Sequence, residues 1–231
     1  MEKIAALFDC DGTLYAAQYG RGLMQYAAQN GRKRLVRALY ASLLVPHLLH
    51  KYQLISTEAY NRPLVSRLAR LAKGMDEAEF CQASEWLVRE YLLPTEKPEV
   101  TARLRQHQVK GHLVVFVSAQ FTPSLELLGA HYRADGLVGT RMEVKSARYT
   151  GRVTPPVITG KDKDPATRAY LAARGETINW EASYAYADSI ADASLFNMVG
   201  HPVAVSPDPK LLALAQKNDW EKIGTARNQS K

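Results

Sequence analysis

Residues 3–14 read KIAALFDCDGTL, and this stretch decides how the chain is expected to fold. Its apolar part runs without a polar interruption to Phe8, as in a parallel strand that is buried on both faces. Asp9 and Asp11 follow at once, and Gly12 lets the chain turn sharply after them. The stretch therefore predicts a buried parallel strand that presents two carboxylates at its carboxyl end.

Three further apolar runs indicate more strands of the same sheet. They cover residues 112–118, 183–188 and 202–206, and each is followed by helix-like sequence. This alternation predicts an α/β fold with βαβ units and a parallel sheet. Because ligands of such sheets bind beyond the carboxyl ends of the strands, Ser118 and Asp188 are expected beside the paired aspartates.

Residues 15–93 have a different pattern and contain no convincing strand. Leu35, Leu39 and Leu43 recur every four residues, which is helical spacing. The sequence therefore predicts a core domain formed by residues 1–14 and 94–231, with a helical cap domain at 15–93 inserted after the first strand.

Two shorter segments complete the expected organisation. Residues 140–154 resemble a short hairpin with a turn near Ser146 and Ala147. The tail from Gly224 onward is expected to be frayed, because termini are often poorly ordered.

The candidate site residues are all acidic, basic or hydroxyl side chains that lie near strand ends or just before a helix. Two ionised carboxylates placed side by side repel each other unless a cation offsets their charge. A hard cation with oxygen ligands is the natural partner, and Mg²⁺ bound together with a phosphate fits best. Each residue alone has a plainer interpretation, such as a surface turn or a helix cap. Together they predict a phosphate site; the full set is Asp9, Asp11, Thr13, Ser118, Lys161, Asp188 and Asp192, with Lys163 as the competitor of Lys161.

This ordered set resembles the four motifs of the haloacid dehalogenase superfamily of phosphohydrolases, and its phosphoserine-phosphatase-like group in particular. The resemblance covers nearly the whole chain. It implies a flavodoxin-like, Rossmann-like core with a five-stranded parallel sheet, under an all-helical cap of the first type. It also implies a magnesium-dependent phosphomonoesterase. A small phosphomutase, or a phosphoryl-transfer or phosphate-binding protein of the same fold, is the alternative.

The resemblance assigns the chemical steps to two acids. Asp9 is expected to attack phosphorus and form an aspartyl-phosphate, which divides the hydrolysis into two easier steps. Asp11 is expected to protonate the leaving alcohol and then to activate water. Thr13 supports the loop, and Asp192 orients the motif lysine or a metal-bound water.

The binding roles follow from the same resemblance. The magnesium ion is expected to be held by Asp9, by Asp188 and by the backbone carbonyl of Asp11. Ser118 and Lys161 are expected to bind the phosphate oxygens.

Some positions depart from the phosphoserine phosphatase pattern. Gln18 stands near the place of a glutamate, Ser66 near that of a carboxylate-binding arginine, and Ala119 and Gln120 replace two glycines. Phosphoserine is therefore expected to be a poor substrate. A small phosphorylated metabolite and a phosphate that carries an apolar tail remain the alternatives.

The amino-acid composition restricts the kinds of partner and cellular location that are expected for this protein. The net charge of +7 favours anionic partners, but no nucleic-acid motif is present. Two cysteines exclude a disulfide scaffold, and early acidic residues argue against a signal peptide, so a cytoplasmic protein is expected. The basic and apolar stretch at residues 32–51 fits either a cap helix packed on its neighbours, which is favoured, or a peripheral membrane contact. The oligomeric state stays open.

Overall fold

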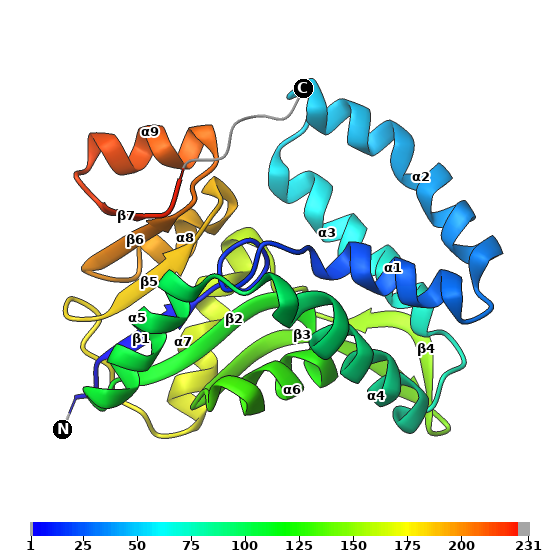
Figure 1. Ribbon diagram of the computed structural model, residues 1–231, viewed down its shortest axis with the longest axis horizontal. Helices are drawn as coiled ribbons and strands as arrows, with labels where there is room; N and C mark the ends of the chain where they lie inside the picture. The colour runs from blue at the N-terminus through cyan, green and yellow to red at the C-terminus, as the bar shows by residue number, and fades with distance from the viewer. Residues whose placement is uncertain (1, 226–231) are drawn as a thin grey trace.

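The computed structural model describes residues 2–225 and is built around one sheet of strand order β4-β3-β2-β1-β5-β6-β7 (Figure 1). Only the β3–β4 pair is antiparallel among these pairings. The α/β prediction is therefore confirmed. The strands are β1 Ala5–Phe8, β2 Leu113–Phe121, β3 Gly136–Lys145, β4 Arg148–Thr154, β5 Tyr184–Ala187, β6 His201–Val205 and β7 Glu221–Ile223.

The expected Rossmann-like parallel core is confirmed, whereas the strand count and order differ from the five-stranded, flavodoxin-like form of it. Six strands are parallel, and in chain order they run 3-2-1-4-5-6 across the sheet. This is the Rossmann order; a flavodoxin-like sheet runs 2-1-3-4-5. The missed strand, β7, has three residues at the sheet edge, two of them charged and exposed, so it lacks the apolar run of a central strand.

The central strand β1 is buried on both faces, as its unbroken apolar sequence predicts. Its side chains alternate between two core clusters, with Ala6 and Phe8 in one and Ala5 and Leu7 in the other. The first cluster includes residues of α5 Pro98–Val109 and α6 Thr122–Tyr132. The second includes residues of α7 Lys163–Ala173, α8 Ala193–Phe196 and α9 Pro209–Lys217.

The segment between β1 and α5 is helical throughout its regular elements, and the first core cluster extends into it. Its α4 lies against α6 of the sheet layer, so the two regions share apolar contacts. The division into domains 1–14 with 94–231 and 15–93 stays a prediction. The elements are α1 Tyr19–Gln29, α2 Lys33–Lys51, α3 Thr57–Leu68, η1 Ala69–Ala72, α4 Glu77–Trp86, η2 Leu87–Leu92 and η3 Leu93–Thr95.

The predicted hairpin is confirmed. Ser146 and Ala147 join β3 to β4, and both have positive φ values of 49° and 58°, as a two-residue turn of type I′ requires. The end of the predicted frayed tail, residues 226–231, lies outside the described residues. No helix in residues 2–225 has the length and apolar character needed to cross a membrane.

Candidate active site

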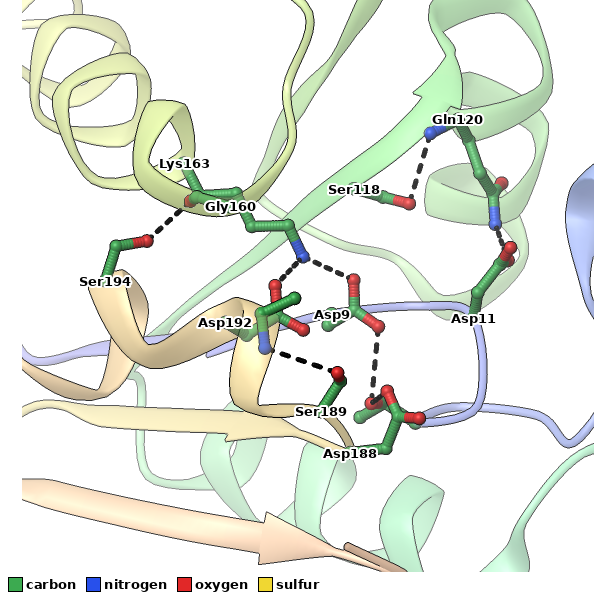
Figure 2. Close-up of polar contacts among 12 residues, drawn as sticks. Asp9, Asp11, Ser118, Gln120, Gly160, Lys163, Asp188, Ser189, Asp192 and Ser194 are labelled. Atoms are coloured by element: carbon green, nitrogen blue, oxygen red, sulfur yellow. Dashed lines mark hydrogen bonds and ion pairs between the residues drawn. The ribbon is translucent and has the colours of Figure 1, made fainter. Parts of the chain in front are cut away.

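The site forms where the strand order reverses, between β1 and β5. Asp9 directly follows β1 and Asp188 directly follows β5, and the two strands pair in parallel, so their carboxyl ends meet. Ser118 lies inside the longer β2, beside a register irregularity between Val117 and Phe121, and is buried. The structure thus brings together three of the strand-end residues that the sequence singled out (Figure 2).

Lys163 is the lysine of the site. Its Nζ donates to Asp9 Oδ1 at 2.6 Å and lies 2.5 Å from Asp192 Oδ1 (Figure 2). Burial alone disfavours the ammonium, but the charges of Asp192 and Asp9 outweigh it and raise the pKa of Lys163 above its usual value. Lys163 is therefore held as a cation between two carboxylates.

The prediction of Lys161 for this role is corrected. The Lys161 side chain is 76% exposed and lies 3.9 Å from Glu58, whereas that of Lys163 is 5% exposed. The 3₁₀ turn η4 Gly160–Asp162 leads directly into α7. Residues two apart on such turns point in different directions, so only one of the two lysines can face the site.

Exchange of each lysine for methionine tests this assignment. Lys163→Met should lower kcat/KM for p-nitrophenyl phosphate by about 10²–10³-fold, since a preorganised donor to the transferring group is lost. Lys161→Met is the matched control and should stay within about twofold, because exposed ion pairs contribute little. Equal losses in steady-state kinetics would contradict the assignment.

Three buried carboxylates surround this lysine. Asp9, Asp188 and Asp192 each offer one oxygen, and these oxygens lie within 4.8 Å of one another. The hydroxyl of Thr13 is 3.3 Å from Asp9 Oδ2 and 3.3 Å from Asp188 Oδ1, and its expected supporting role stays a prediction. Burial raises the pKa of Asp192 above its usual value, although the charge of Lys163 opposes the shift. Three acids against one ammonium leave excess negative charge, and hard oxygen donors fit Mg²⁺.

Asp11 points away from this cluster. Its Oδ1 accepts hydrogen bonds from Tyr15 Oη at 2.9 Å and Gln120 Nε2 at 2.8 Å, and its Oδ2 accepts one from Tyr19 N at 2.9 Å. Burial and the neighbouring Asp9 raise the pKa of the Asp11 carboxyl to about 6, although these hydrogen bonds oppose the shift. The group can therefore hold a proton near neutral pH, as a general acid must.

The expected metal ligands Asp9 and Asp188 lie in this cluster. Among the described side chains, Asp192, which was expected only in a supporting role, adds a third carboxylate to it. Participation of the Asp11 backbone carbonyl stays a prediction.

Sequence reasoning missed two neighbours of Asp11. Tyr15 is fully buried and its hydroxyl bonds Asp11, while the Gln120 amide contacts both residues. Within the described chain, Gln120 Oε1 is buried without a hydrogen-bond partner. The available signal was the replacement of a motif glycine by Gln120.

The cap residues Gln18 and Ser66, and Arg62 one helical turn before Ser66, do not form a ready binding site for a substrate carboxylate. Arg62 is ion-paired with Asp162 and lies 3.6 Å from Glu58. The hydroxyl of Ser66 donates to the Arg62 backbone carbonyl at 3.0 Å. Gln18 stands at the start of α1 and makes no side-chain cap.

Comparisons with known proteins agree with this geometry. A family model described as haloacid dehalogenase-like hydrolase matches residues 6–197. A histidinol-phosphatase of Neisseria meningitidis is 28% identical over 94% of this chain and 97% of its own. A phosphoserine phosphatase of Mycobacterium tuberculosis is 29% identical over 94% of this chain and 69% of its own.

Solved structures share the fold. A protein of unknown function from Bordetella pertussis superposes with a TM-score of 0.84 at 24% identity, covering 97% of this chain and 99% of that one. A phosphoserine phosphatase bearing an analogue of its phospho-aspartyl intermediate gives a TM-score of 0.65 at 20% identity, covering 99% and 96%.

Proposed function

The chain belongs to the haloacid dehalogenase-like hydrolase family, and from that premise we propose that it is a magnesium-dependent phosphomonoesterase with an aspartyl-phosphate intermediate on Asp9. One observation carries the proposal. The Asp9 carboxylate lies against Lys163 and within the oxygen cluster that also contains Asp188 and Asp192. Asp9, the proposed nucleophile, therefore contacts both the proposed phosphate-binding cation, Lys163, and the carboxylates that could hold a metal ion.

The first step uses Asp9 and Asp11. A carboxylate oxygen of Asp9 forms a bond to phosphorus while the bond from phosphorus to the ester oxygen breaks. Asp11 gives its proton to the leaving oxygen, so the product departs as a neutral alcohol. Lys163 and Ser118 stabilise the charge on the phosphoryl oxygens.

The second step restores the enzyme. Asp11, now ionised, accepts a proton from water, and the oxygen of that water bonds to phosphorus. The bond from phosphorus to Asp9 breaks, which releases phosphate and regenerates the carboxylate. Asp9, Asp188, Asp192 and the Asp11 carbonyl would hold the magnesium ion, which when bound offsets the repulsion between anionic nucleophile and anionic phosphate.

Metal dependence provides the most direct test of this proposal. Purified protein should hydrolyse p-nitrophenyl phosphate with Mg²⁺, and chelation by EDTA should reduce the rate to background. Added Mg²⁺ should restore it, whereas Ca²⁺ should not, since Ca²⁺ prefers more ligands and looser geometry. Full activity in exhaustively chelated protein would contradict the metal assignment. Binding of phosphate esters without release of inorganic phosphate would favour the phosphate-binding or mutase alternative.

The substrate prediction follows from the cap. Arg62 is already engaged by acids, and Gln18 and Ser66 are neutral. An unpaired buried ammonium or carboxylate costs several kcal/mol. The kcat/KM for L-phosphoserine should therefore lie at least about tenfold, or about 1.4 kcal/mol, below that of the best phosphomonoester.

Parallel kinetics on four compounds measure this: phosphoserine, histidinol phosphate, glycerol phosphate and a lysophosphatidate. The prediction fails if phosphoserine ranks first, because Arg62, after leaving its acidic partners, or Arg67 would then bind the substrate carboxylate. Equal rates with glycerol phosphate and the lysophosphatidate would show that an apolar tail is not recognised.

A further inference from the structure

Large apolar side chains that remain exposed are concentrated on one stretch of this protein. Of nine such residues in the described chain, seven lie between residues 40 and 54, on α2 and directly after it. Isolated exposed apolar residues are ordinary, but a contiguous group marks an interaction surface. We call the following set the α2 surface: Tyr40, Leu44, Val45, Leu48, Leu49, Tyr52 and Leu54.

The helix α2 has one face in the core and the other in solvent. Val36, Leu39 and Leu43 are buried, and the helix packs against α1 and α3 at the outer edge of the molecule (Figure 1). Tyr40 and Leu44 are 56% and 59% exposed. The apolar stretch at residues 32–51 is therefore only partly packed on neighbouring helices: Leu39 and Leu43 are buried, whereas Leu44 lies in solvent.

Charge along the chain segment that carries this surface is of one sign. Residues 12–57 contain no aspartate or glutamate but six lysines and arginines. On α2 itself, Lys33, Arg34, Arg37 and Lys51 are exposed. Within residues 2–225 none of these four pairs with a carboxylate. Their charges are thus left for an external partner.

Basic and apolar side chains share one stripe of α2. Residues three or four apart lie on the same side of a helix. At that spacing the stripe has basic residues at both ends and apolar residues between them. Along the helix its members are Lys33, Arg37, Tyr40, Leu44, Leu48 and Lys51. A hollow that Lys33 and Arg34 help to line adjoins the start of the helix.

We propose that the solvent-facing side of α2 docks the protein on acidic phospholipid membranes. The apolar middle of the stripe enters the boundary between headgroups and acyl chains, and the basic ends meet the anionic headgroups. Tyr40 and Tyr52 have the amphipathic rings that favour this depth. A second copy of the chain fits this surface less well than a membrane. In a symmetric dimer the basic residues of the two α2 helices would face each other and repel, and residues 12–57 contain no acid that could offset their charge.

Vesicle cosedimentation tests the proposal with the full chain. Partition onto vesicles of phosphatidylcholine and phosphatidylserine should exceed partition onto phosphatidylcholine alone by at least about tenfold, given the gain that each basic residue brings at an anionic surface. Raising the salt from about 0.1 M to about 1 M should remove most of this difference, as the Debye length falls from about 10 Å to about 3 Å.

Matched variants separate the two contributions. Lys33→Ala with Arg37→Ala should lower binding to the acidic vesicles about tenfold or more. Leu44→Ser with Leu48→Ser should lower it by a similar factor, since the inserted apolar area is lost. Val109→Ser, at an 89% exposed position of α5, and Lys217→Ala, at an exposed position of α9, are the controls and should bind like the wild type.

Circular dichroism and thermal unfolding should show that each variant is folded. Equal, weak partition onto both vesicle types would overturn the proposal, and so would controls that lose binding as much as the α2 variants do. A wild-type dimer in lipid-free solution that becomes monomeric in the Leu44 and Leu48 variant, without vesicle binding, would assign the surface to a second copy instead.

Discussion

Replacement of Asp9 by asparagine should leave the fold intact and lower kcat by about 10⁴–10⁶-fold, the loss typical of a removed nucleophile. An amide neither attacks phosphorus effectively nor binds a cation as strongly as a carboxylate. The fold should survive because Lys163 keeps its partner Asp192, so no buried ammonium is left unpaired. Steady-state release of inorganic phosphate measures the rate, and the thermal unfolding midpoint checks the fold.

A control and a second readout make this experiment specific. Asp219→Asn carries out the same substitution at an exposed residue with φ 53°, a conformation that asparagine tolerates, and should keep wild-type turnover. Acid-quenched wild-type protein should carry label from a ³²P-labelled substrate, and the Asp9 variant should not. Retention of even a tenth of the wild-type rate would exclude Asp9 as the attacking group.

Asp11→Asn should have the next largest effect. General acid–base help is typically worth about 10²–10⁴-fold, and an alkyl phosphate should lose about 10³–10⁴-fold because its leaving alkoxide needs a proton. In the phosphorylation step p-nitrophenyl phosphate should lose less, since its leaving group is stable without protonation. Pre-steady-state measurements on the two substrates give this comparison, and equal losses would contradict the assignment.

The surroundings of Asp11 call for a stability control. Both oxygens of Asp11 accept hydrogen bonds, so the amide of the variant must place its NH₂ group against a donor. A lower unfolding midpoint is therefore expected. The leaving-group dependence separates the chemical role from this loss, because an unfolded fraction lowers both substrate rates equally.

The sequence predicted the sheet and the position of the site because both depend on local order along the chain. Unbroken apolar runs of this length are typical of central parallel strands, which are buried on both faces, and β1 and β5 are such strands. Since parallel strands end at one edge, the side chains that follow them must meet there, as Asp9 and Asp188 do. The strand β7 escaped prediction because a short, charged edge strand has no such run.

The sequence did not predict which of the candidate side chains face the site. Lys161 and Lys163 stand two residues apart before a helix, and the path of one turn decided which of them became buried. Asp192 joined the carboxylate cluster through its position after β5, while the side chain of Asp11 turned toward Tyr15 and Gln120. These outcomes depend on side-chain direction, which contacts from distant segments fix.

Local patterns along the chain are enough to predict a parallel α/β sheet with acids at its carboxyl edge, because strand burial and chain order are local properties. The lysine that faces Asp9 and the leucines of α2 that stay in solvent depend on the three-dimensional packing. Helical spacing can align Leu39, Leu43, Leu44 and Leu48 along α2, but it cannot state how wide a stripe the neighbouring helices cover. That width depends on how α1 and α3 pack against the helix, and packing between distant segments is the property that a local pattern does not contain.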